Sequence, residues 1–462
     1  MRFGEYTAAV QYFLGDLYIF LVRRRYSRIE IRLGTDLKYA VVTIIGIDDT
    51  DSRTHGMCTT YVADSIARAI AEIGSIDRVL LIRCNPAVKY KTRGNAALAI
   101  HTDAAPVDVE ERARAHISTL AIERDDRTQP GLVIAPGSVD AIPSAVEQFA
   151  VEAVQSHHDL ESTVSLIDQV GFQSFRWGDG RGVIGALAAI GAWPAFDDWT
   201  YEHIAYRAPD RWGTTRDVES NSVRAAADSA YPTVWDTIDR GSDEIVCVPR
   251  TPGPVLYGIR GDDPAICRSV AADIESEPVD RERTFITNQG TDAHLQEASI
   301  QNTTNGHSYC LDGTVSAAPE TKQGGHVFFT IEDSNETLQC VAFEPTKRFR
   351  DRVRQLRNGD QITACGEIQA GTLKLEKFAV RTLTQWEWVT PRCQSCDRTM
   401  ESAGAAQGYR CRRCGTSAAT RQQQPIDRSL KIGWYEVPPR ARRHIAKPLI
   451  RGGFDAPVYP EQ

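Results

Sequence analysis

Lysine is scarce in this chain, since only nine of its 53 basic residues are lysine and the others are arginine. Asp and Glu number 61, which gives a formal net charge of -8. This acidic excess argues against a nonspecific polyanion binder, although local basic grooves remain compatible with it. The composition is typical of proteins from a very salty cytoplasm. Salt screens phosphate contacts there, so a nucleic-acid enzyme must depend more on shape, stacking and bidentate arginine.

Long hydrophobic runs are also lacking. The apolar stretch from Tyr12 to Val22 is interrupted by Gly15 and Asp16, and its basic residues follow it, so it fits neither a signal peptide nor a transmembrane span. The 11 cysteines are too few for the dense disulfide framework of a small secreted protein, and four of them form two CxxC pairs. We expect a cytoplasmic protein with no membrane role.

The chain divides by pattern into several domains, as a length of 462 residues predicts. Residues 42–175 alternate strand and helix patterns, beginning with a buried strand that ends at Ile47, and favour an α/β or α+β domain. Residues 176–290 give a mixed pattern. Residues 300–385 show five short strands with a helix between the third and fourth. This is the order of an OB barrel, a fold that commonly binds single-stranded nucleic acid.

Two CxxC pairs lie within residues 390–420, ahead of an arginine-rich tail at 421–462. Four thiolates at this spacing can bind one zinc ion tetrahedrally, which leaves no position for a substrate and indicates a structural site. The alternatives are four unrelated thiols or a redox pair. Several arginines nearby favour phosphate contact. The predicted zinc ligands are Cys393, Cys396, Cys411 and Cys414.

Three carboxylates, Asp48, Asp49 and Asp51, follow the first buried strand directly. Magnesium prefers oxygen ligands, and a phosphoryl-transfer site without a Walker loop needs them from elsewhere. In an extended chain Asp48 would face away from the other two, so all three can meet one metal only if the backbone turns there. We assign the metal to Asp48 and Asp49 first. The alternative is an acidic, solvated loop that caps the next helix.

That next helix begins at Thr59 and Thr60. Unpaired N–H groups and the helix dipole favour a phosphate at such a position, either bound or carried on a hydroxyl. A helix cap without chemistry is the alternative. Glycine-bearing loops elsewhere can offer backbone N–H groups or an arginine to a nucleotide phosphate. Their candidate nucleotide-binding residues are Arg93, Gly94, Asn95, Gly180, Arg181 and Gly182.

Seven separated strings, in collinear order between residues 46 and 444, resemble the archaeal agmatidine synthetases, the tRNA(Ile) 2-agmatinylcytidine synthetase family, and the match spans residue 43 to the end. They are GIDDTDSRTHGMCTTY at 46–61, KTRGNAA at 91–97, TQPGLVI at 128–134, GRGVIGALAAIG at 180–191, PVLYGIRG at 254–261, TNQGTDAHL at 287–295 and YEVPPRARRH at 435–444.

The resemblance implies a multidomain α+β protein with a kinase-like ATP- and metal-binding domain at 42–175, a ferredoxin-like domain at 176–290, an OB domain that binds tRNA and a zinc ribbon. It also implies a ligase that joins agmatine to the wobble cytidine of the CAU anticodon of isoleucine tRNA. In this family ATP is cleaved to AMP and two phosphates, and a phosphoryl group activates the cytosine carbonyl oxygen before agmatine displaces it.

By motif, Asp48, Asp49 and Asp51 inherit the metal and ATP role, and Thr59 or Thr60 inherits a phosphorylatable hydroxyl, with Thr59 favoured. ATP, magnesium and zinc are the expected cofactors, and tRNA and agmatine the partners. No DNA or membrane is expected.

Two other functions compete with this interpretation. A non-catalytic single-strand-binding protein would need only the OB domain and ribbon, and a metal phosphohydrolase of small nucleotides would need neither. We also expect residues 1–41, which lack the acidic excess, to be a non-native leader that precedes a true start at Val42. A genuine N-terminal extension is the alternative.

Overall fold

The computed structural model describes residues 42–89 and 95–460. Residues 1–41, which carry the leader hypothesis, lie outside the described residues, and so do Arg93 and Gly94. Within the described ranges, every helix is too short or too polar to cross a bilayer.

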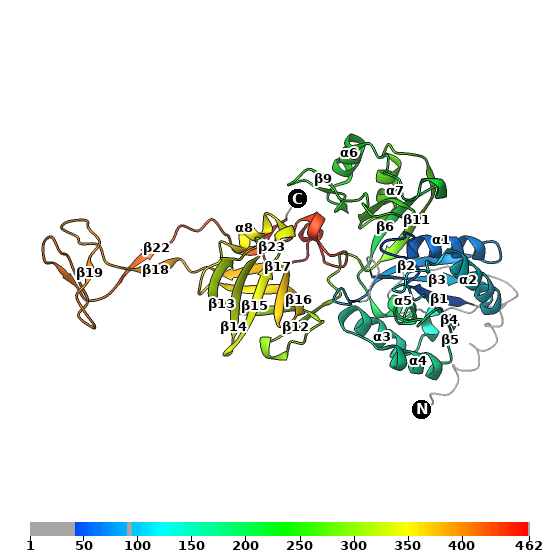
Figure 1. Ribbon diagram of the computed structural model, residues 1–462, viewed down its shortest axis with the longest axis horizontal. Helices are drawn as coiled ribbons and strands as arrows, with labels where there is room; N and C mark the ends of the chain where they lie inside the picture. The colour runs from blue at the N-terminus through cyan, green and yellow to red at the C-terminus, as the bar shows by residue number, and fades with distance from the viewer. Residues whose placement is uncertain (1–41, 90–94, 461–462) are drawn as a thin grey trace, which may run out of the picture. The chain divides into compact units, whose positions relative to one another are not determined.

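A nine-stranded sheet forms the N-terminal part, in the order β5-β4-β1-β3-β2-β11-β6-β10-β7 (Figure 1). β1 pairs antiparallel with both β3 and β4, whereas β2 and β11 are parallel. The sheet continues across residue 175, where the sequence predicts the end of the first domain. The strands are β1 (Thr43–Asp48), β2 (Ile76–Arg83), β3 (Ala96–Thr102), β4 (Gly131–Pro136), β5 (Gln173–Arg176), β6 (Thr200–Arg207), β7 (Val234–Trp235), β10 (Val255–Gly261) and β11 (Val279–Thr287).

Helices cover both faces of this sheet, so β1 is buried on both sides, as its β-branched run predicts. Ile44 packs on the side of α3, α4 and α5, and Ile45 and Ile47 pack on the side of α1 and α2, because successive strand residues point to opposite faces. α6 and α7 pack together near β6 and β10. The helices are α1 (Thr59–Ile70), α2 (Pro106–Leu120), α3 (Ser144–Gln155), α4 (Leu160–Gln169), α5 (Val183–Ala195), α6 (Ser220–Ala230) and α7 (Pro264–Ala272).

The five expected OB strands and their helix are confirmed. The barrel runs β13-β14-β15-β17-β16 and closes where β16 pairs with β13. Parallel pairing of β15 with β17 joins the two halves, and a disulfide links Cys310 to Cys365 across β13 and β16. The elements are β12 (Leu295–Ala298), β13 (Ser308–Thr321), β14 (Val327–Asp333), β15 (Glu336–Ala342), α8 (Phe349–Val353), β16 (Gln361–Gln369) and β17 (Thr372–Thr382).

After the barrel the chain forms small sheets and then returns to it. β18 pairs with β22, the sheet β19-β20-β21 follows β18 in the chain, and β23 adds to β17 of the barrel. Earlier in the chain, before the barrel, β8 pairs with β9 in a separate two-stranded sheet. These strands are β8 (Ile238–Asp239), β9 (Glu244–Ile245), β18 (Trp386–Val389), β19 (Glu401–Ser402), β20 (Tyr409–Arg410), β21 (Ser417–Ala418), β22 (Gln422–Pro425), β23 (Gly433–Glu436) and β24 (Val458–Tyr459).

Candidate functional site

One cavity of about 810 Å³ brings the sequence-predicted residues together. Its walls come from the β1–α1 loop, the start of α5, strands β6 and β10, and the C-terminal segment at 443–445. Gly180 is not among the lining residues, although its φ of +69° provides the turn just before Arg181. The predicted residues that line the cavity are Asp48, Asp49, Asp51, Thr59, Thr60, Asn95, Arg181 and Gly182.

The backbone turns within the acidic cluster, as convergence of the carboxylates requires. Asp49 has a φ of +59°, in the left-handed region, and its N–H donates to Asp48 Oδ1 at 2.6 Å. Asp and Asn tolerate this conformation better than most residues because their side chains can hydrogen-bond locally. The turn leaves Asp48, Asp49 and Asp51 all lining the cavity.

Asp48 lies against the first turn of α5. A Cβ atom added to Gly185 would come within 2.0 Å of Asp48 Oδ2, so only glycine allows this approach. Burial raises the pKa of Asp48 well above its usual range, and the neighbouring charge of Asp49 raises it further. The site therefore holds a carboxylate whose charge is poorly compensated by the protein alone.

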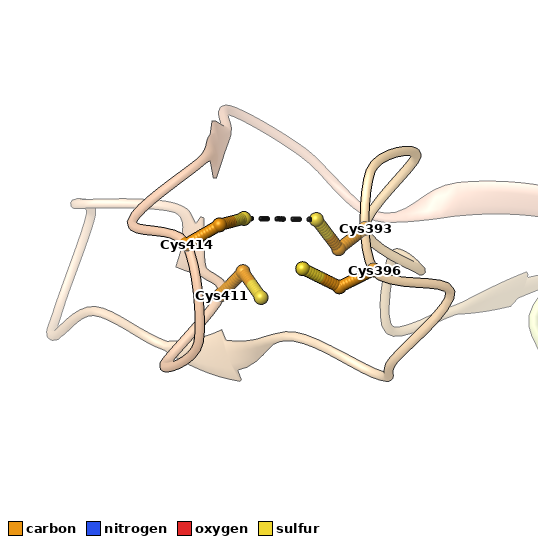
Figure 2. Close-up of side chains that lie close together, drawn as sticks. All are labelled: Cys393, Cys396, Cys411 and Cys414. Atoms are coloured by element: carbon orange, nitrogen blue, oxygen red, sulfur yellow. Dashed lines mark hydrogen bonds between the residues drawn. The ribbon is translucent and has the colours of Figure 1, made fainter.

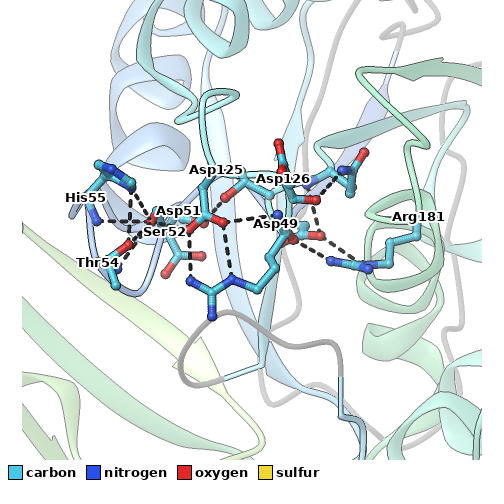
Figure 3. A network of polar contacts seen from close by, with 11 residues as sticks. Asp49, Asp51, Ser52, Thr54, His55, Asp125, Asp126 and Arg181 are labelled. Atoms are coloured by element: carbon cyan, nitrogen blue, oxygen red, sulfur yellow. Dashed lines mark hydrogen bonds and ion pairs between the residues drawn. The ribbon is translucent and has the colours of Figure 1, made fainter.

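Asp49 is held by two loops that are distant in the chain. Its Oδ2 atom accepts a hydrogen bond from the N–H of Gln129 at 3.2 Å and lies 3.3 Å from Arg181 Nε, as Figure 3 shows for the arginine. Burial nevertheless raises the pKa of Asp49 to about 7, although Arg181 lowers it. Arg181 thus brings a positive charge to the acidic turn, which fits the predicted contact with a phosphate.

The loop at 125–129, which contains Gln129, makes further contacts with the acidic turn. Ser52 Oγ donates to Asp125 Oδ2 at 2.5 Å (Figure 3). Thr128 Oγ1 donates to the carbonyl of Asp51 at 2.7 Å. The hydrogen bond from Ser52 and those from Arg127 hold the pKa of Asp125 well below its usual range, so it stays ionised. The string TQPGLVI therefore contributes contacts that hold the acidic turn.

Helix α1 begins at Thr59, as expected, and Cys58 precedes it without a side-chain cap. Its first N–H groups are therefore available to an anion. Thr59 Oγ1 lies 3.5 Å from Asp51 Oδ1, whereas Thr60 Oγ1 lies 3.0 Å from the sulfur of Cys58. Of the two hydroxyls, Thr59 is the one that contacts the acidic turn.

A second group of cavity-lining residues was not predicted from the sequence. Glu202 lies between Arg83, at 3.5 Å, and Arg260, at 3.2 Å, and also accepts a 2.5 Å hydrogen bond from Gln289. His444 reaches this group from the C-terminal segment, where its carbonyl accepts from the N–H of Gly290 at 2.8 Å. Arg260 and burial lower the pKa of His444 well below its usual value, so the imidazole is neutral at pH 7. The strings PVLYGIRG, TNQGTDAHL and YEVPPRARRH contain Arg260, Gln289 and His444, but no periodicity places them at a site. Arg83 and Glu202 lie outside all seven strings.

The arginine-rich tail is largely occupied with the protein itself. Arg442 pairs with Asp236 and, at 2.8 Å, with Glu436, and Arg443 Nε lies 2.8 Å from Glu376. Tyr435 stacks on Phe378 in the barrel core. These side chains anchor the C-terminal segment so that residues 443–445 line the cavity.

The four cysteines of the two CxxC pairs converge (Figure 2). Their sulfur atoms all lie within 4.8 Å of one another. Zn–S bonds of ~2.3 Å arranged tetrahedrally place sulfur atoms ~3.8 Å apart, so the cluster fits a structural zinc ion.

The chain matches four families over successive segments. These are the TiaS TCKD domain at 44–179, the TiaS FLD domain at 180–294, the OB-fold nucleic acid binding domain at 309–377 and the TiaS C-terminal zinc ribbon domain at 390–430.

Whole-chain relatives agree with these matches. The chain is 52% identical to the tRNA(Ile) 2-agmatinylcytidine synthetase TiaS of Haloquadratum walsbyi, over 91% of this chain and 100% of that protein. It is 44% identical to the protein of the same name from Methanosarcina mazei, over 88% and 97%.

Two crystal structures share the fold over most of the chain. A complex of TiaS with isoleucine tRNA and ATP superposes with a TM-score of 0.84 at 38% identity, covering 91% of this chain and all of that one. A complex of TiaS with isoleucine tRNA, AMPCPP and agmatine gives 0.81 at 35% identity, with the same coverage.

Proposed function

This chain belongs to the TiaS family of tRNA(Ile) 2-agmatinylcytidine synthetases, and we propose that its 810 Å³ cavity is where ATP, agmatine and the wobble cytidine react. The activity is an ATP-dependent joining of agmatine to isoleucine tRNA. A non-catalytic single-strand binder and a phosphohydrolase are thereby set aside. Because the substrate is a tRNA, we propose that the protein acts in the cytoplasm.

Convergence of the acidic turn, Arg181 and the start of α1 on one cavity carries this proposal. Asp48 and Asp49 would hold magnesium, because both are buried carboxylates with raised pKa values and a divalent cation would compensate their charge. The ion would neutralise phosphate charge during transfer. Arg181 and the N–H groups of α1 would bind the phosphates directly.

The reaction needs the cytosine carbonyl oxygen to become a leaving group. That oxygen attacks the γ-phosphorus of ATP, the bond from this phosphorus to the β–γ bridging oxygen breaks, and ADP leaves. The amine nitrogen of agmatine then bonds to the carbonyl carbon, so a C–N bond forms while the C–O bond breaks and the oxygen departs with phosphate. The amine must lose a proton in this step. Transfer of the β-phosphoryl group of ADP to the Thr59 hydroxyl or to water leaves AMP. We assign Asp51 and Thr59 a second task, phosphorylation of the Thr59 hydroxyl, which the 3.5 Å separation of their oxygen atoms supports.

We further propose a division of labour along the chain. Residues 42–175 and 176–290 carry the chemistry, and the OB domain at 300–385 and the ribbon at 390–420 bind tRNA while the cytosine leaves the anticodon stack. The segment at 421–462 anchors the cavity wall through Arg442 and Arg443.

Incubation of the protein with ATP, agmatine and an isoleucine tRNA transcript that bears a CAU anticodon tests the function. Nuclease digestion and mass spectrometry should show one cytidine converted to its agmatine adduct, with AMP formed in proportion. A transcript with a GAU anticodon is the control. No adduct from a protein that binds both ATP and tRNA would refute the proposal.

A further inference from the structure

A two-stranded ribbon, β18 paired with β22, joins the barrel to the zinc ribbon (Figure 1). None of its residues is buried. In the antiparallel register Trp386 lies opposite Pro425, and Trp388 lies opposite Gln423. Residues two apart on a strand, and residues opposite one another, share a face. Both tryptophans therefore project from one face, which we call the aromatic face and define as Trp386, Trp388, Gln423 and Pro425.

These two indoles are exposed to an unusual degree. Trp386 is 54% and Trp388 58% exposed, and they are the only tryptophans classed as exposed in the described ranges 42–89 and 95–460. Tryptophan offers the largest apolar surface of any side chain, so leaving two neighbouring ones in water is unfavourable. An isolated two-stranded ribbon gains little stability of its own from them. Binding of a partner to the aromatic face would therefore remove unfavourable apolar surface from water.

Charges on the two-stranded ribbon and on the adjoining zinc ribbon favour a polyanion. Glu387, the one carboxylate within the paired strands, lies on the opposite face. On the adjoining zinc ribbon, Arg398, Arg410 and Arg413 are exposed, and among the described residues none has an ion pair with a carboxylate. Their positive charge contrasts with the net charge of -8 for the whole chain.

We propose that the aromatic face binds unpaired nucleotides of the tRNA by stacking a base on each indole. This rests on the proposed function and adds a binding surface outside its cavity. Strand residues two apart are separated by ~6.8 Å, about twice the ~3.4 Å rise per nucleotide in a stacked strand. Two bases that contact both rings must therefore be unstacked from each other, which selects a loop or a free end over a duplex.

A second copy of this chain fits the aromatic face less well. Four residues give far less than the ~1,200 Å² that a stable protein interface buries, and the arginines of the zinc ribbons of two copies would repel each other.

Stacking on the indoles would also work in the salty cytoplasm that the composition indicates. Salt that screens phosphate contacts leaves base–indole stacking largely intact.

Tryptophan replacement on this face tests the proposal. We expect the double variant W386A/W388A to bind the isoleucine tRNA at least about tenfold more weakly. Its KM for tRNA should rise while kcat at saturating tRNA stays unchanged, and the dependence of affinity on KCl should keep the wild-type slope, because no ionic contact is removed. W386F/W388F should recover most of the affinity. The matched control is E387Q/V389A on the opposite face of the same strand.

Three results would overturn the proposal: wild-type affinity in W386A/W388A with the zinc content retained, equal loss in the E387Q/V389A control, or concentration-dependent dimers by sedimentation that W386A/W388A abolishes. Ultraviolet crosslinking of the indoles should mark unpaired nucleotides, and the crosslinked position distinguishes the anticodon loop from the 3′ end. Crosslinks confined to paired stems would contradict stacking. Absence of agmatine adduct with the wild type would refute the catalytic function alone, since the affinity comparison stays readable.

Discussion

The Nε atom of Arg181 lies 3.3 Å from Asp49 Oδ2, so the GRG loop before α5 meets the acidic turn after β1. Each loop alone resembles an ordinary surface turn. Together they place a cation and three carboxylates on one cavity wall. Changes on either side of this contact should therefore affect the chemistry before they affect the fold.

Asp49→Asn should lower AMP formation by at least about 100-fold, because it removes half of the proposed magnesium site. We expect the Kd for tRNA to stay within about twofold, since we assign most of that binding to the OB domain and the ribbon. Asp126→Asn, a change at an exposed residue in the same region, is the control. Loss of tRNA binding with normal AMP formation would be incompatible with this division of labour.

Thr59→Val should abolish any covalent phosphate on the protein, whereas Thr60→Val should retain it. The reason is that Thr59 Oγ1 faces Asp51, while the hydroxyl of Thr60 contacts the sulfur of Cys58. Intact-protein mass spectrometry after incubation with ATP distinguishes the two variants. A phosphorylated Thr59→Val protein would sink the assignment.

The double variant C393S/C396S should bind no zinc, compared with one ion per wild-type chain by elemental analysis. Serine oxygens do not replace two of four thiolates that must converge within 4.8 Å. We expect tRNA binding to weaken more than ATP cleavage. Fresh wild-type protein without zinc would contradict the proposal.

His101 should make the fold sensitive to mild acid. Burial, and then the charge of Arg78, lower the pKa of this β3 imidazole to about 4, below the usual ~6.5 of an unfolded chain. Between these two values the unfolded chain binds a proton that the folded chain does not. The stability that the neutral His101 imidazole contributes is therefore fully present above pH 6.5 and falls as the pH drops towards 4.

Lowering the pH from 7 to 5 should reduce the free energy of unfolding by about 2 kcal/mol through His101. In urea unfolding, the free energy of unfolding of His101→Leu should fall by about 2 kcal/mol less than that of the wild type when the pH is lowered from 7 to 5. If the stability of the two proteins depended on pH identically, His101 would not be the cause of the loss in mild acid.

Local sequence determined much of this protein. The β-branched run before Asp48 specified β1, the apolar spacing after Thr59 specified α1, and the five short strands with one helix specified the barrel, because strand and helix periods are properties of neighbouring residues. The CxxC spacing likewise specified which sulfur atoms converge. These features need no knowledge of the rest of the fold.

Tertiary structure decided which segments meet. The left-handed Asp49 that turns the carboxylates inward, the contact of Arg181 with it, and the return of His444 to the wall formed by Arg260 all depend on the order of strands in the sheet. Two tail arginines, Arg442 and Arg443, are paired with carboxylates because β23 returns the chain to the barrel, which composition alone does not reveal. Strand order is set by long-range pairing and burial, which no local period records.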